Sequence, residues 1–184
     1  RAVPNLDVIR PADANETAAA WKVALEHDGP VGLILTRQKL PILSETVGKA
    51  VEGVARGAYI LSESPLDRVD MILIATGSEV SDTLEAQKIL QERRIGARVV
   101  SMPSWELFDK QPIFYKLTVF PDDVIKRLAV EAGTPLGWEH YVGSYGDVIG
   151  IDHFGASAPY SRIKEEFGFT PEKIAQRAEK LMAQ

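Results

Sequence analysis

The stretch from residue 70 to residue 80 constrains the fold more than any other. An apolar run at 70–75 is followed directly by Thr76, Gly77 and Ser78, and then by apolar residues at helical spacing. Short apolar runs bounded by turn residues are typical of buried strands. The pattern therefore predicts a strand, a tight turn and a helix, with Ser78 as the N-cap and Gly96 at the helix end.

This predicted turn is also a candidate ligand site. Backbone N–H groups at a helix start can hold a phosphate or carboxylate, so Thr76, Gly77 and Ser78 form a candidate anion or effector site. The alternative is an ordinary strand-to-helix connection, because one glycine falls short of a phosphate-binding fingerprint.

Further strands and helices alternate along the chain, which indicates an α/β protein. Asp13 and Glu16 have the spacing of a capping box, and Trp21 and Leu25 lie on a stripe expected to pack on a sheet. Two helices are predicted near the carboxyl terminus, the second starting at Thr170. The remaining strands are expected at 6–9, 31–36, 57–61, 97–101, 127–131 and 148–152.

The predicted helix after Ser157 should bury Tyr160, Ile163 and Phe167. A glycine-rich stretch further upstream carries Trp138, Tyr141 and Tyr145. These three aromatic residues are expected to cover the edge of the sheet, and an aromatic-walled pocket is the alternative.

Arg37 follows the apolar run at 31–36, which has the character of a strand buried on both faces. Ligands of open α/β sheets bind at the carboxyl ends of the strands. The guanidinium of Arg37 could thus bind a phosphate or carboxylate, and a surface or interdomain salt bridge is the alternative.

Composition excludes several classes of function. With 26 acidic and 21 basic residues, the chain has no basic face for nucleic acid. No apolar run approaches the roughly 20 residues that span a membrane. Absence of cysteine excludes disulfides and thiolate catalysis, and three scattered histidines give no metal-ligand spacing. The first residue is not Met, and the chain is expected to be a piece of a longer protein.

Several motifs in order and spacing resemble the transketolase family. They lie at 9–13 (IRPAD), 33–38 (LILTRQ), 75–80 (ATGSEV), 99–103 (VVSMP), 154–159 (FGASAP) and 165–170 (EEFGFT). The resemblance implies the end of a thiamine-pyrimidine-binding domain at 1–39, a linker at 40–56 and a C-terminal domain at 57–184. It also implies a three-layer αβα domain with a mostly parallel sheet of about five strands. The first strand of that sheet is antiparallel, and a strand-helix-strand remnant of another α/β domain precedes it.

The resemblance also implies an activity for the parent enzyme. Transketolases move a two-carbon ketol group between sugar phosphates, with thiamine diphosphate and a divalent cation, Mg or Ca. Arg37 matches the family's substrate-phosphate arginine. We expect no catalytic, cofactor or metal residue in these 184 residues, which should contribute domain packing and dimer contacts and be inactive alone. A cytoplasmic homodimer of the pentose phosphate pathway is expected.

Two alternatives remain open at this point. One is the same segment of another thiamine enzyme, dihydroxyacetone synthase or deoxyxylulose-phosphate synthase. The other is a regulatory anion-binding module at Thr76, Gly77 and Ser78.

Overall fold

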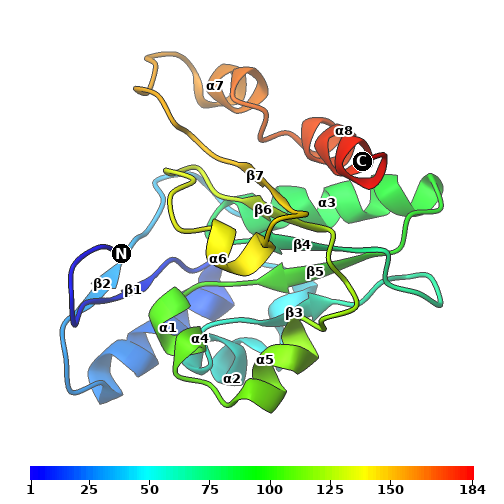
Figure 1. Cartoon of the computed structure of the whole chain (residues 1–184). Coiled ribbons are helices and arrows are strands. Elements are labelled where there is room, and N and C mark those ends of the chain that lie inside the picture. The colour runs from blue at the N-terminus through cyan, green and yellow to red at the C-terminus, as the bar shows by residue number, and fades with distance from the viewer.

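The computed structural model describes all 184 residues, which form two sheets with helices packed around them (Figure 1). The smaller sheet pairs β1 with β2 in parallel, and α1 connects the two strands. The larger sheet has five strands in the order β3-β5-β4-β6-β7, parallel except that β3 runs antiparallel to β5. The strands are β1 (Asp7–Ile9), β2 (Val31–Leu33), β3 (Tyr59–Ser62), β4 (Met71–Ala75), β5 (Ala97–Ser101), β6 (Arg127–Val130) and β7 (Asp147–Ile149).

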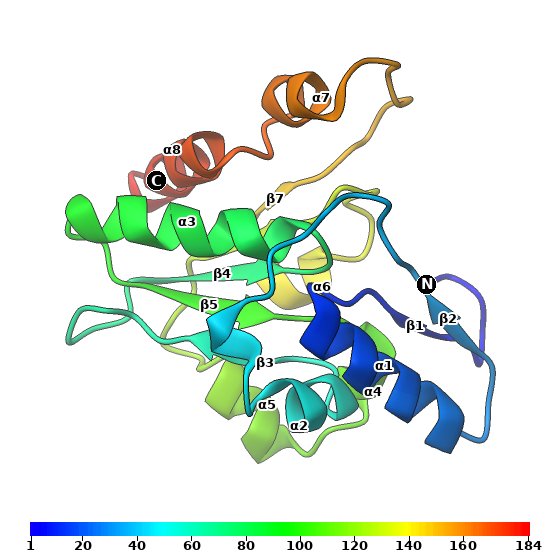
Figure 2. The ribbon, with the colours of Figure 1, turned by 180° about the vertical axis from the view of Figure 1, so that it is seen from behind.

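Helices cover both faces of the larger sheet (Figure 2). On one face lie α3 and α8, and the other face is covered by α4, α5 and α6. The three-layer arrangement, the mostly parallel sheet and the antiparallel first strand are confirmed. The helices are α1 (Ala14–Glu26), α2 (Ala50–Ala55), α3 (Glu79–Glu92), α4 (Trp105–Asp109), α5 (Ile113–Val119), α6 (Glu139–Val142), α7 (Tyr160–Glu166) and α8 (Pro171–Met182), with a 3-10 turn η1 at Ser44–Thr46.

The central strand β4 is fully buried because both of its faces meet helices. Successive side chains of a strand point to opposite faces. Met71, Leu73 and Ala75 accordingly join the core under α3 and α8. Ile72 and Ile74 join the core on the opposite face, with Trp138 and Tyr141. The strand predicted at 70–75 is therefore confirmed.

Two of the three aromatic residues predicted to cover the edge of the sheet are buried, and they cover its face, in the same core as Ile72 and Ile74 of β4. Trp138 and Tyr141 are buried. The Trp138 ring packs edge-to-face on the Trp105 ring, and the two ring centroids lie 4.8 Å apart. Tyr145 is exposed, because it follows α6 in a loop before β7 rather than facing the core.

Predictions of burial in the smaller sheet are wrong. Ala19 and Ala20 are the apolar residues of α1 that pack inward, with Ile9 and Val54. Trp21 and Leu25 are exposed, Leu25 by 81%. The apolar run at 31–36 is half-buried or exposed. The reason is that β2 has β1 as its one neighbour, so this two-stranded sheet offers little surface to cover.

Predictions at the carboxyl terminus have a mixed outcome. Thr170 caps α8, and Ile174, Ala178 and Leu181 are buried against the first core. In contrast, α7 starts after Pro159 rather than Ser157 and buries none of its residues. This segment extends past the edge of the sheet near β7, as Figure 1 shows, so no wide surface is available to it.

The predicted end of α3 is also wrong in detail. Arg94, with φ of 60°, adopts the left-handed conformation that follows the helix. Gly96 instead permits close chain approach, because a Cβ there would lie 2.3 Å from the carbonyl oxygen of Arg68.

Candidate functional site

The turn between β4 and α3 is built around Arg10, a residue that the sequence argument did not select. Gly77 has φ of +64°, a conformation that favours glycine. A Cβ on Gly77 would lie 2.7 Å from Cζ of Arg10, so glycine also makes room for this side chain. The N–H of Gly77 donates to the carbonyl oxygen of Arg10 at 3.0 Å. That N–H is therefore already engaged.

Ser78 is the N-cap residue of α3, as predicted, because the helix begins at Glu79. Its backbone is helical, however, and its side chain makes no bond to an N–H of the first turn. The hydroxyl donates instead to the carboxylate of Glu79. The position of the N-cap is therefore confirmed, and its side-chain capping bond is absent because the acidic neighbour accepts the hydroxyl.

Glu79 stands where an anion would bind at this helix start. Its carboxylate pairs with the Arg10 guanidinium and accepts the N–H of Ala132 at 2.9 Å. Arg10 donates a second bond, 2.6 Å long, to the carbonyl oxygen of Thr76. The charged groups at this turn thus satisfy one another within the protein.

Arg37 lies in the loop that follows β2, which ends at Leu33 and is three residues shorter than the predicted strand at 31–36. The side chain is exposed and makes no hydrogen bond or ion pair. Thr36 shapes this loop by accepting the N–H of Gln38 at 3.1 Å. Arg37 therefore has a guanidinium available to an incoming anion.

The structure brings the Arg37 loop and the turn at Gly77 to the same place. A hollow of about 130 Å³ lies between them. Its lining consists of Arg10, Pro11, Ile34, Leu35, Thr36, Gly77 and Ser78. The turn and the chain directly before Arg37 are therefore neighbours, although Arg37 itself does not line the hollow.

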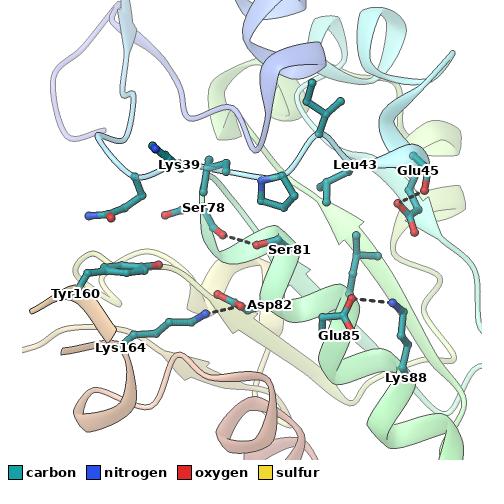
Figure 3. A pocket seen from close by; sticks show the side chains of 16 residues that line it. Lys39, Leu43, Glu45, Ser78, Ser81, Asp82, Glu85, Lys88, Tyr160 and Lys164 are labelled. Atoms are coloured by element: carbon teal, nitrogen blue, oxygen red, sulfur yellow. Dashed lines mark hydrogen bonds and ion pairs between the residues drawn. The ribbon is translucent and has the colours of Figure 1, made fainter. Parts of the chain in front are cut away.

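A larger hollow of about 740 Å³ opens next to this place, between the chain at 38–45, α3 and α7 (Figure 3). Two ion pairs lie on its α3 side, between Asp82 and Lys164 and between Glu85 and Lys88. Burial raises the pKa of the Asp82 carboxyl despite the ammonium of Lys164. Most of the charge in this hollow is thus neutralised in pairs.

A buried carboxyl joins α1 to the larger sheet. Glu16 accepts hydrogen bonds from the Tyr59 hydroxyl at 2.7 Å and the Ser101 hydroxyl at 2.6 Å. It also accepts the N–H of Ala12, while Asp13 accepts the N–H of Glu16. Capping of α1 is confirmed, although Glu16 bonds one residue further back than a capping box requires. Burial raises the pKa of the Glu16 carboxyl.

Neither a metal site nor a membrane segment is found among the 184 residues. No three side chains of the His, Cys, Asp and Glu types gather closely enough to hold a metal ion. No helix has both the length and the apolar character needed to cross a membrane.

A sequence signal for Arg10 exists. Arg10 follows β1 directly, and Arg37 comes four residues after β2, so both arginines lie beyond the carboxyl end of a parallel strand. The partners of Arg10 are 66 and 69 residues away, however, and no local pattern identifies them.

Two family models match the chain. The model described as the transketolase-like TK C-terminal domain matches residues 57–170. The model for the transketolase pyrimidine binding domain matches residues 1–42.

Curated relatives and solved structures agree with these models. Transketolases of Halalkalibacterium halodurans and Bacillus subtilis are 52% and 51% identical over 99% of this chain. The chain spans 27% of the length of each. A Pichia stipitis transketolase in complex with sedoheptulose-7-phosphate superposes on the whole chain with a TM-score of 0.90 and 45% identity, which is 26% of that structure.

One further structure is described as the inactive β4 tetramer of a split-gene transketolase. It matches the whole of this chain and 60% of its own, with a TM-score of 0.81 and 25% identity. The sequence motifs, the two sheets and the family models agree, and this chain belongs to the transketolase family.

Proposed function

We propose that this chain is the carboxyl-terminal part of a transketolase, and that Arg37 binds the phosphate of its sugar substrates. The parent enzyme transfers a two-carbon ketol group from a ketose phosphate to an aldose phosphate. Relatives at about half identity carry this name, and one solved neighbour holds a sugar phosphate. These names favour transketolase over dihydroxyacetone synthase and deoxyxylulose-phosphate synthase.

The observation that carries the role of Arg37 is its free guanidinium in the loop after β2. A guanidinium can donate two parallel hydrogen bonds to phosphate, which makes it a strong and directional ligand. Arg10 is the arginine that lines the nearby hollow, and its charge is already paired with Glu79. Arg37 is therefore the residue that can meet a phosphate without breaking a bond within the protein.

The turn at Thr76, Gly77 and Ser78 gains no such support as an anion site. The N–H of Gly77 is engaged by Arg10, and the carboxylate of Glu79 would repel an anion at the helix start. We therefore assign the phosphate to Arg37 alone.

We propose that the residues of this chain hold no complete site for the cofactor expected of the family. That cofactor is thiamine diphosphate with a divalent cation, Mg or Ca, and such a cation takes oxygen ligands, carboxylates among them. We therefore derive no step of the reaction through the cofactor. This chain's contribution is to bind and orient the sugar phosphate and to pack the domains together.

The proposed organisation has residues 1–39 in the pyrimidine-binding domain, 40–56 as a linker and 57–184 as the C-terminal domain. Helix α2 and turn η1 lie within that linker, where Asp13 accepts the N–H of Leu43. We propose that the enzyme is a cytoplasmic homodimer of the pentose phosphate pathway. The segment alone should be inactive, in keeping with the inactive assembly of the split-gene relative.

The test of this function is a kinetic comparison in the full-length enzyme. Arg37→Ala should raise the KM for sugar phosphates by roughly 10-fold or more, since hydrogen bonds to charged groups contribute about 1.5–3 kcal/mol. Arg162→Ala removes another exposed arginine and should leave KM unchanged. An unchanged KM in the Arg37 variant would disprove the assignment.

A further inference from the structure

Arg10 makes more connections between the two sheets than the end of a short strand needs. Its N–H donates to the carbonyl oxygen of Pro103 at 2.9 Å. Its carbonyl oxygen accepts the N–H of Gly77 and the hydroxyl of Thr76. Its guanidinium bonds to Thr76 and Glu79. Backbone and side chain of Arg10 thus both attach the end of β1 to the larger sheet.

Glu79 makes this attachment rigid. One carboxylate oxygen receives both the Arg10 guanidinium and the N–H of Ala132, which follows β6. The chain segments that follow β1, β4 and β6 therefore meet at a single carboxylate. Side-chain exposure is 14% for Arg10 and 5% for Glu79, so water competes little for this pair.

The Arg37 loop depends on the same attachment. Strand β2 pairs with β1, and the N–H of Ile34 donates to the carbonyl oxygen of Ile9, immediately before Arg10. Arg37 itself makes no bond that would fix its loop to the larger sheet. Its position relative to residues 57–184 is therefore set through β1, which Arg10 attaches at the end nearer the turn at Gly77, while Asp7 and Val8 bond to Lys110 and Glu106.

We propose that Arg10, held by Glu79 and by the turn at Gly77, is a positioning residue that fixes where Arg37 presents its guanidinium to the substrate phosphate. This inference rests on the proposed role of Arg37. It assigns Arg10 no contact with substrate, because its guanidinium is already bonded within the protein.

A double-mutant comparison in the full-length enzyme tests the inference. The substrates are sedoheptulose 7-phosphate and the same ketose without phosphate. Arg10→Ala should raise KM for the phosphorylated ketose by about fivefold, within the range of couplings between neighbouring residues. The KM of the unphosphorylated ketose should stay within about twofold, because a positioning role acts through Arg37.

The variant Arg10→Ala combined with Arg37→Ala should match Arg37→Ala alone, since Arg10 has nothing to position once Arg37 is gone. Arg10→Lys keeps a cation beside Glu79 and should restore part of the lost affinity. Arg177→Ala breaks a more exposed arginine pair, with Asp147, away from this hollow and is the control for loss of an arginine pair elsewhere. If Arg10→Ala prevents folding, Glu79→Gln replaces it as the test variant. This substitution removes the negative charge that pairs with Arg10 and keeps a side chain of nearly the same shape.

Each outcome is decisive. Equal effects of Arg10→Ala with and without Arg37 would overturn the positioning role, because Arg10 would then act independently. An unchanged KM in both Arg10→Ala and Glu79→Gln, with Arg37→Ala still impaired, would also overturn it. An unchanged KM in Arg37→Ala alone would reject the proposed function instead.

Discussion

The guanidinium of Arg10 and the carboxylate of Glu79 form an ion pair between the end of β1 and the start of α3, 69 residues apart in the chain. Both side chains are largely removed from solvent. The pair joins the two-stranded sheet, in which β1 is buried and β2 is half-buried, to a sheet that is buried on both faces. The attachment of the smaller sheet therefore depends in part on this contact.

Removal of one partner from this pair should be costly. We expect Glu79→Ala to lower the free energy of unfolding by about 3 kcal/mol, because an unpaired Arg10 charge would remain buried. Urea unfolding followed by circular dichroism measures the change. The control Glu85→Ala breaks an exposed pair with Lys88 and should cost less than about 1 kcal/mol. Equal losses in the two variants would contradict the importance of the buried pair.

Two glycines with similar positive φ separate strain from crowding. Gly77 and Gly48 have φ of +64° and +74°, and nothing lies within 4 Å of a Cβ on Gly48. Alanine at either position should cost about 1–2 kcal/mol for the left-handed backbone. Gly77→Ala should cost about 1–3 kcal/mol more, because its Cβ would meet Arg10. Unfolding free energies measure both variants, and equal losses would show that the Arg10 side chain yields without cost.

The buried carboxyl of Glu16 predicts a pH dependence of stability. Burial raises its pKa in the folded state above the ordinary value of 4.5. The folded protein then holds a proton that the unfolded chain releases, so stability falls as the pH rises from 4.5 through the raised pKa. In Glu16→Gln this contribution is absent.

The stability of Glu16→Gln relative to the unaltered protein should thus increase as pH rises. Urea unfolding of both proteins between about pH 5 and about pH 8 measures the difference, in which the other titrating groups cancel. A difference that does not change with pH would mean that the hydrogen bonds from Tyr59 and Ser101 fully offset burial.

The parts of this fold that the sequence predicts best are those where one physical cause dominates. Strands β4, β5 and β6 are buried on both faces, so their apolar runs end where the strands end. Thr170 caps α8 with a local hydrogen bond, and Pro171 has the fixed φ that suits the first residue of a helix. Both effects involve residues close together in the sequence, so the sequence alone predicts them.

Long-range partners could not be predicted in the same way. The exposure of Leu25 depends on how many strands flank β1 and β2, which no pattern in α1 encodes. Glu16 has the spacing of a local cap, yet its hydroxyl partners, Tyr59 and Ser101, come from β3 and β5. At the candidate site, Arg37 was found from its place after a strand, whereas the ion pair of Arg10 with Glu79 required the tertiary structure.

The most direct test of the account is the selectivity of the full-length enzyme for phosphorylated substrate. The measurement is kcat/KM for a ketose phosphate divided by kcat/KM for the same ketose without phosphate, before and after Arg37→Ala. If Arg37 binds the phosphate, the ratio should fall by roughly 10- to 100-fold, because hydrogen bonds to a charged group contribute about 1.5–3 kcal/mol. A ratio that stays the same would show that another residue binds the phosphate.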